Sequence, residues 1–338
     1  MSTVENRKIG GKERGSCPEL RPYALSPCYK DFLWGGGRLQ RKYGKSAAPP
    51  RLAESWELAD LEAGRSDLIL EDGSFLPLSE LIPLSPRAFF GSRFSGERLP
   101  VLVKLIDAEK DLSVQVHPSD RTADASRGEA GKAEMWYIAE CRSGASLYLG
   151  FRRDVTREEF LRAAKAGTVC DLLNRVPVKK GDVFFIRPGT VHAIGAGIVV
   201  AEIQQASNTT FRVYDFNRRD AGGNLRPLHL ERAAAVADFH ALAPAECRAT
   251  GRVTFPAFTL TEMFLCEYFK AYSLDVRAEC AFRGDGESFR HLLCVEGEAE
   301  LRHAGRAFPL VPGGSLFLPA AIGEYTLQGK ARLLLTRL

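Results

Sequence analysis

Residues 181–205, with the sequence GDVFFIRPGTVHAIGAGIVVAEIQQ, contain short apolar runs separated by turn residues. The runs are rich in Val, Ile and Phe, and Gly181, the Pro188-Gly189 pair and Gly197 separate them. This pattern is typical of short antiparallel strands joined by tight turns. His192 follows the Pro188-Gly189 turn, so the stretch predicts a β-barrel with a candidate metal ligand near one of its turns.

The same pattern of short β-like runs continues on both sides of this stretch. On the N-terminal side the runs are residues 99–107 (LPVLVKLID), 112–117 (LSVQVH), 134–140 (EMWYIAE) and 146–151 (SLYLGF), and further runs return after residue 251. Thr156 and Glu159 form a capping box that predicts a helix from Thr156 to about Lys165. The Ala-rich segment 229–242 predicts a second helix. We therefore expect a mainly β protein with a small helical insertion and a helical connection.

An internal repeat suggests two related barrels. Residues 181–188 and 313–319 share a glycine, an apolar strand and a closing proline. Four residues past its proline the first copy has His192, whereas the second has Gly323. We divide the chain into a flexible extension (1–20), an N-terminal catalytic domain (21–220), a connecting segment (221–250) and a C-terminal domain without metal ligands (251–338).

Composition excludes several classes of protein. The net charge of +4 comes from 46 basic and 42 acidic residues without a basic stripe, which argues against a nucleic-acid partner. No apolar run approaches the roughly 18 residues of a membrane helix, so we expect no membrane partner. The eight cysteines are scattered and predict reduced thiols in a cytoplasmic protein. The oligomeric state is left open.

Four residues form a candidate metal site. Strand alternation places Gln115 and His117 on one face, and Glu134 and His192 are the natural completing ligands. Imidazole and carboxylate are normal zinc ligands, and an open position admits substrate. Gln115 is the unusual member, because it is a neutral oxygen donor that binds weakly or only when substrate is absent.

Long segments of the chain resemble the short bacterial form of type I phosphomannose isomerase. These segments are residues 102–120 (LVKLIDAEKDLSVQVHPSD), 131–140 (GKAEMWYIAE), 181–218, and the WGGGRL and ESWEL segments that begin at residues 34 and 54. The resemblance covers about residues 22–338. It implies two fused cupin (jelly-roll) barrels, one zinc ion per chain, and the interconversion of mannose 6-phosphate and fructose 6-phosphate.

The resemblance also assigns expected roles to individual residues. The metal positions of the family fall on Gln115, His117, Glu134 and His192, the catalytic arginine on Arg212, and polar positions around the substrate on Lys104, Ser113, Lys132, Glu202, Asn208 and Arg218. Lys132 and Glu202 are the candidate bases, and Ser113 and Arg218 the candidate phosphate contacts. Ile194 is a departure, because longer relatives have a tyrosine at this position.

Two other functions remain as alternatives. Another metal-dependent cupin enzyme is one, either an oxygenase or a different metal-dependent sugar-phosphate isomerase. Redox cupins usually present a histidine-rich face suited to iron, and Gln115 does not fit that face. A non-catalytic sugar-phosphate-binding cupin is the other. The presence of Arg212 together with every metal position argues against it.

Overall fold

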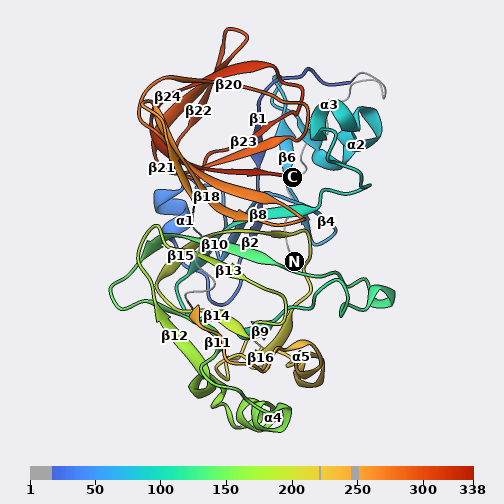
Figure 1. Cartoon of the computed structure of the whole chain (residues 1–338), viewed down its shortest axis with the longest axis vertical. Coiled ribbons are helices and arrows are strands. Elements are labelled where there is room, and N and C mark those ends of the chain that lie inside the picture. The colour runs from blue at the N-terminus through green and yellow to red at the C-terminus, as the bar shows by residue number, and fades with distance from the viewer. Residues whose placement is uncertain (1–16, 221, 245–250) are drawn as a thin grey trace.

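The computed structural model describes residues 17–220, 222–244 and 251–338. Most of the extension expected at residues 1–20 lies outside these residues. The described chain is mainly β, as expected, and its strands form two stacked units with helices α4 and α5 at the far end of the N-terminal unit (Figure 1).

A six-stranded antiparallel sheet lies at the centre of the molecule. Its strands in order are β13 (Val183–Ile186), β10 (Glu134–Cys141), β15 (Ile198–Gln205), β8 (Val101–Ala108), β3 (Glu54–Leu58) and β2 (Cys28–Lys30). Every residue of β8 and β15 is buried. Both faces of this sheet are therefore covered, which explains why residues 99–107 are almost continuously apolar instead of alternating.

A five-stranded sheet faces the six-stranded sheet and completes the first barrel. Its strands in order are β12 (Leu173–Pro177), β11 (Ser146–Phe151), β14 (His192–Ile194), β9 (Val114–Val116) and β16 (Phe211–Tyr214). Its outer face buries Val114, Val116 and Phe211 against α4 (Arg157–Ala166) and α5 (Leu230–Val236). Its inner face is free to carry polar groups.

The two predicted helices are present. Thr156 caps α4 by accepting a hydrogen bond from the Glu159 backbone N–H at 3.1 Å, and Gly167 ends the helix in a left-handed conformation. The Glu159 carboxylate contacts Arg153 instead of reaching back to the cap. Helix α5 ends at Val236, shorter than the Ala-rich segment suggested, and it packs on the first barrel.

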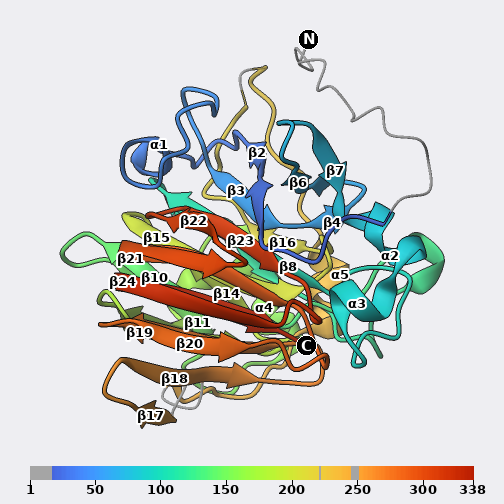
Figure 2. The same ribbon diagram turned by 90° about the horizontal axis from the view of Figure 1, so that it is seen from above.

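An eleven-stranded sheet builds the second unit (Figure 2). Its main path is β17 (Arg252–Thr254), β18 (Phe258–Leu265), β19 (Lys270–Val276), β24 (Glu324–Arg337), β21 (Arg290–His303), β23 (Ser315–Leu318), β1 (Tyr23–Ser26), β6 (Asp67–Ile69) and β7 (Phe75–Pro77), with β20 (Cys280–Arg283) on β24 and β22 (Arg306–Leu310) on β21. Three strands from the beginning of the chain thus extend the C-terminal barrel.

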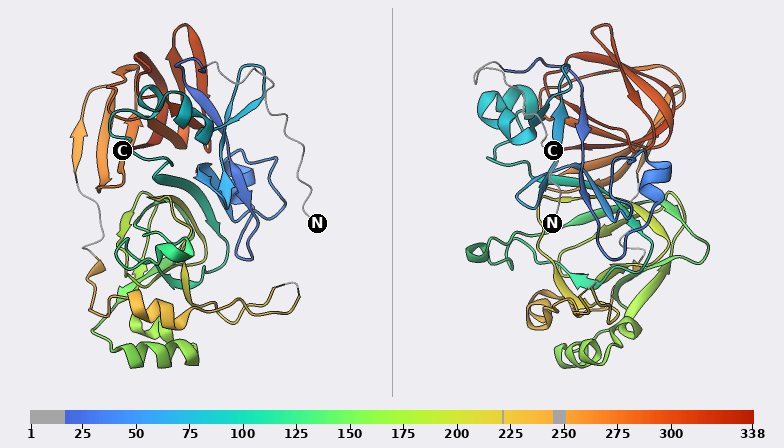
Figure 3. Two further views of the ribbon diagram at one scale, coloured as in Figure 1. Left: turned by 90° about the vertical axis from the view of Figure 1, so that its right-hand side faces the viewer. Right: turned by 180° about the vertical axis from the view of Figure 1, so that it is seen from behind.

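The remaining short elements lie mostly in connections around the barrels (Figure 3). They are the hairpin β4 (Asp60–Leu61) and β5 (Gly64–Arg65), the helices α1 (Arg38–Lys42), α2 (Leu81–Leu84) and α3 (Pro86–Phe90), and the 3-10 turns η1 (Leu78–Glu80), η2 (Ala125–Arg127) and η3 (Val169–Leu172). In the part of the chain that the structure describes, no helix has the length and apolarity needed to span a bilayer.

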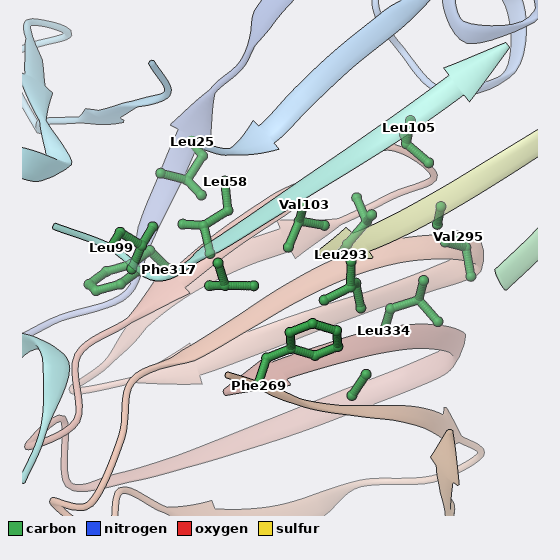
Figure 4. Close-up of a cluster of buried hydrophobic side chains, with 14 of the residues drawn as sticks. Leu25, Leu58, Leu99, Val103, Leu105, Phe269, Leu293, Val295, Phe317 and Leu334 are labelled. Carbon is green, nitrogen blue, oxygen red and sulfur yellow. The ribbon is translucent and has the colours of Figure 1, made fainter. Parts of the chain in front are cut away.

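The largest apolar core lies between the two units. Val103 and Leu105 point from the six-stranded sheet toward Leu293, Phe317 and other side chains of the second barrel (Figure 4). All four of these side chains are fully buried. The second barrel therefore covers the outer face of the six-stranded sheet, while the inner face of that sheet faces the candidate site.

This shared core predicts that the first unit does not survive alone. The four-part division of the chain remains a prediction, and we expect residues 20–250 expressed alone to aggregate, because removing the second barrel exposes the apolar face around Val103 and Leu105. Soluble yield, size-exclusion profile and isomerase activity measure the effect. Co-expression of residues 251–338 is the matched control and should recover soluble protein, whereas a soluble and fully active fragment would contradict the covering role.

Candidate metal centre and active site

Three predicted ligands meet at one buried point inside the first barrel. His117 follows β9, Glu134 begins β10 and His192 begins β14. Their ligand atoms all lie within 4.8 Å of one another, with His117 Nε2 3.2 Å and His192 Nε2 3.7 Å from the Glu134 carboxylate oxygens. All three residues are at most 1% exposed. Two opposing sheets thus bring together three residues spread over 75 positions of the sequence.

Backbone carbonyls orient both imidazoles toward this point. Nδ1 of His117 lies 2.9 Å from the carbonyl oxygen of Thr209, and Nδ1 of His192 lies 2.8 Å from that of Thr190. A carbonyl only accepts hydrogen bonds, so each Nδ1 carries the proton and each Nε2 presents its lone pair to the site. A hydrogen bond from the outer ring nitrogen to a carbonyl is typical of metal-ligating histidines.

The protonation states also suit a metal. Burial lowers the pKa of His117 to about 3, and the Lys132 ammonium acts in the same direction. Burial also lowers the pKa of His192, so both rings are neutral at neutral pH. Glu134 is fully buried; burial raises its pKa, but Lys132, His117 and His192 outweigh this and hold the pKa well below its usual range. The set therefore offers two neutral imidazoles and one carboxylate.

Glu134 gives the most direct evidence that the site is built for a cation. Neither of its buried carboxylate oxygens has a hydrogen-bond partner. Lys132 Nζ forms an ion pair with one of them at 2.6 Å. A buried carboxylate lacking hydrogen bonds is costly, and a metal ion at the shared point would satisfy it.

Gln115 lies beside the triad, next to His192. It is the direct cross-strand neighbour of His192 on β14 and of Arg212 on β16. Directly paired residues point to the same face of a sheet, so all three side chains face the site. Gln115 Nε2 lies 3.4 Å from His192 Nε2, and Ser113 Oγ lies 3.4 Å from Gln115 Oε1. The amide can therefore reach the metal position.

Arg212 is held firmly at the edge of the site. Its backbone is paired with His229 through two hydrogen bonds of 2.8 and 3.1 Å, and Nη1 donates to the Pro227 carbonyl at 2.8 Å. Its buried Nε has no partner. Burial, with Arg226 as the next cause, lowers the pKa of Arg212 to about 10. The guanidinium is still charged at neutral pH and has a donor to spare.

A second row of ionisable groups crosses the six-stranded sheet opposite these residues. Lys104 Nζ lies 3.2 Å from a Glu202 carboxylate oxygen and 3.6 Å from one of Glu54, and all three residues are buried. Trp136 Nε1 donates to Glu202 at 2.8 Å and Trp56 Nε1 donates to Glu54 at 2.7 Å. The Lys104 ammonium therefore balances the charge of two carboxylates, and each carboxylate also accepts a hydrogen bond from a tryptophan indole.

This row shifts the pKa of its members in opposite directions. Burial and the nearby Glu134 carboxylate raise the pKa of Glu202, while Lys104 opposes them. Burial lowers the pKa of Lys104, but Glu54 and Glu202 outweigh it and raise the pKa above its usual value. Lys104 therefore stays charged, and Glu202 is a buried carboxylate of the site whose pKa is raised.

Sequence reasoning missed Glu54. The ESWEL segment carried the signal, since Glu54 and Trp56 alternate onto one face of β3, and β3 pairs with the strand that holds Lys104. Trp56, on the same face, is more than an apolar core residue. The structure shows that it is buried and that its indole N–H also fixes a carboxylate.

A cluster of arginines lies on the loop after β16. Arg218 contacts the Asp215 carboxylate and also donates to the carbonyl oxygens of Asp215 and Asp111. Arg226, which the sequence reasoning did not single out, reaches the same carboxylate at 3.3 Å and lies 5.1 Å from the centre of the Trp34 ring. Arg218 is thus more fully engaged by the protein than Arg226 is.

Of two further residues considered in the sequence, Asn208 is exposed and Ile194 is buried. Asn208 is exposed on the loop between β15 and β16, while its neighbour Ser207 is buried and accepts the backbone N–H of Thr209. Ile194 is buried on the inner face of the five-stranded sheet, paired with Leu147. An aliphatic side chain therefore occupies that position in the barrel.

The fold and this site define the class of protein. Two stacked β-barrels, one of which encloses a His-Glu-His metal-binding triad, are the features of a metal-dependent cupin enzyme. Residues 23–138 match the catalytic domain of type I phosphomannose isomerase, and residues 259–338 match the cupin domain of mannose-6-phosphate isomerase.

Related sequences indicate the same family of enzymes. Mannose-6-phosphate isomerase ManA of Bacillus subtilis is 34% identical over 320 residues, which cover 94% of this chain and 99% of the relative. A mannose-6-phosphate isomerase of Streptococcus mutans is 39% identical over 206 residues, 60% of this chain and 64% of the relative. The chain belongs to the type I mannose-6-phosphate isomerase family, which confirms the family and the isomerase function expected from the sequence.

Solved structures agree in fold. The crystal structure of the mannose 6-phosphate isomerase from Bacillus subtilis superposes with a TM-score of 0.85 at 31% identity, covering 94% of this chain and 99% of that one. A zinc-bound mannose 6-phosphate isomerase superposes with a TM-score of 0.74 at 19% identity, covering 93% and 98%. The two-barrel arrangement is therefore shared with these enzymes.

Proposed function

We propose that the chain interconverts mannose 6-phosphate and fructose 6-phosphate with one zinc ion per chain, held by His117, Glu134 and His192, with Gln115 as a further ligand. The observation that carries this proposal is the fully buried Glu134, whose oxygens lack hydrogen bonds and face two correctly oriented imidazoles. The zinc-bound relative supports the choice of metal. Zinc, when bound, acts as a Lewis acid toward sugar oxygens.

The residues around the triad supply the proton transfers. Isomerisation moves a proton between C1 and C2 of the sugar through a cis-enediol, which requires a base and a group that carries the hydroxyl proton. Glu202 is buried with a raised pKa, and Lys132 Nζ lies between His117 and Glu134. We propose that these two residues share the transfers, with Glu202 acting on carbon and Lys132 on oxygen.

The remaining polar residues bind and orient the substrate. The spare donor of Arg212 stabilises negative charge that develops on the enediolate, without giving up its own proton. We propose that Ser113 and Arg218 contact the phosphate and that Arg226, less engaged by the protein, joins them. Lys104 and Asn208 remain proposed substrate contacts, and Lys104 also balances the charge of Glu202.

We also propose a cytoplasmic location and a sugar phosphate as the small-molecule partner. The cysteines among the described residues are free thiols, which suits a reducing compartment. The proposed location rests on composition, and the proposed partner rests on the substrate class of the family. The oligomeric state stays open.

One assay tests the activity and the metal together. Purified protein supplied with mannose 6-phosphate should form fructose 6-phosphate, detected by a coupled enzyme reaction. A chelator should abolish product formation, and added Zn²⁺ should restore it. Binding of the sugar phosphate without turnover, in the metal-loaded protein, would favour the non-catalytic binding cupin, and restoration by Fe²⁺ but not Zn²⁺ would overturn the metal assignment.

A further inference from the structure

The loop of residues 118–133 links two of the metal-binding residues. It leaves the barrel directly after His117 and returns directly before Glu134. At its base the two arms of the loop touch, because the Lys132 backbone N–H donates to the Pro118 carbonyl at 3.0 Å. The position of this base therefore fixes His117 and Glu134 relative to each other, and it also places Lys132.

Asp120 is the side chain that closes the base of the loop. Its Oδ1 accepts the Gly131 backbone N–H at 2.8 Å, and its Oδ2 accepts Gln205 Nε2 at 3.2 Å. The Gln205 amide in turn accepts the Ala133 backbone N–H at 2.7 Å through its oxygen. Asp120 thus reaches both residues that flank Lys132, one directly and one through Gln205.

The close approach of Asp120 explains a glycine in the loop. A Cβ at position 131 would lie 2.5 Å from both the backbone nitrogen and Oδ1 of Asp120. Such contacts are far too short for two packed atoms, so only glycine fits against the carboxylate here. The close contact therefore depends on both residues: the carboxylate of Asp120 and the absence of a side chain at Gly131.

The third partner of Asp120 comes from the second barrel. Tyr268, in the turn between β18 and β19, donates its hydroxyl to Asp120 Oδ2 at 2.6 Å. The Tyr268 ring packs against the core between the two barrels. A residue of the barrel to which we assign no metal ligands thus holds the carboxylate that closes the metal-site loop.

We propose that Tyr268 and Asp120 are positioning residues through which the second barrel sets the geometry of Lys132 and Glu134. The inference rests on the proposed role of Lys132. Tyr268 orients the Asp120 carboxylate, which fixes the Gly131 amide directly and the Ala133 amide through Gln205. Lys132, between these two amides, is thereby held with its Nζ 2.6 Å from Glu134. The second barrel then acts on the reaction without touching the substrate.

Three variants of the full-length, zinc-loaded protein test this connection. Asp120→Ala removes all three hydrogen bonds that the carboxylate accepts. It should lower kcat about tenfold, because a small misplacement of a catalytic group can lower the rate by up to about 100-fold. Asp120→Asn keeps an acceptor for Gly131 and should recover part of that loss. Tyr268→Phe removes one of three partners and should lower kcat by about two- to threefold. KM should stay within about twofold, since none of these side chains is proposed to contact substrate.

Hydrogen exchange supplies a readout that does not depend on activity. Exchange of the Gly131 and Ala133 amides should speed up in Tyr268→Phe and more strongly in Asp120→Ala, while strands β19 and β24 keep their protection. Tyr272→Phe is the matched control, because Tyr272 lies in the same barrel, on β19, with its partly buried ring packed against the apolar core of that barrel. It should leave both kcat and the exchange of the loop unchanged.

Each result bears on a distinct claim. Faster exchange confined to the loop, together with lower kcat and unchanged KM, supports the positioning role. Faster loop exchange with unchanged kcat overturns it, and so does a loss of protection spread evenly over both barrels. Full activity in Lys132→Met would instead overturn the proposed role of Lys132, and it is measured separately.

Discussion

Replacing His117 with alanine should leave the protein folded, with bound zinc well below one ion per chain and almost no isomerase activity. The variant removes one of the three groups that converge within 4.8 Å. Loss of a partner outside the ligand shell costs roughly 10–100-fold in metal affinity, so loss of a direct ligand should cost more than about 100-fold. Metal analysis and the coupled assay on the same sample measure both effects.

Two histidines of the second barrel are the controls for this experiment. His303 lies near the surface with Nδ1 against the Glu324 carbonyl, and His291 is buried with Nε2 2.6 Å from Ser315 Oγ. His303→Ala and His291→Ala should keep the full zinc content, although the second variant loses a buried polar contact. A full metal complement in His117→Ala, or metal loss in His303→Ala, would show that the site lies elsewhere.

The residues of the candidate metal site could be predicted from the sequence partly because local rules place two of them. Alternation along β9 places Gln115 on the inner face of its sheet, and His117 follows directly at the end of that strand. The Pro188-Gly189 turn places His192 at the start of the next strand. Motif resemblance then linked these local positions to Glu134. The first two steps needed only short-range geometry, which a sequence pattern records well, whereas Glu134 was assigned through the resemblance.

Other features depend on strand pairing across long distances, which no local pattern records. Strand β1 looks like any short apolar segment, yet it pairs with β23 of the second barrel, nearly 300 residues away. Glu54 joined the site only once β3 was seen to pair with β8. The contact between Tyr268 and Asp120 joins two turns on different barrels. Such contacts follow from the packing of whole sheets.

The second large effect is expected at Arg212. Arg212→Ala should lower kcat by a factor on the order of 10² to 10³, the cost of a lost oxyanion donor, with bound zinc and fold unchanged. KM should change much less, because the interaction is made mainly with charge that develops in the transition state. Arg212→Lys keeps the charge but loses the fork of N–H donors, so its kcat should fall between those of wild type and alanine.

Comparison with the neighbouring arginines separates catalysis from binding. Arg218→Ala and Arg226→Ala should raise KM more than they lower kcat, because a phosphate contact exists in the ground state and the transition state alike. The larger rise should come from Arg226, since Arg218 already binds Asp215 and the Asp111 carbonyl. Steady-state kinetics with metal content measured on the same samples decides the roles. Near-wild-type turnover in Arg212→Ala would exclude its catalytic role, because neither its buried, unpartnered Nε nor its place beside Gln115 would then matter to the reaction.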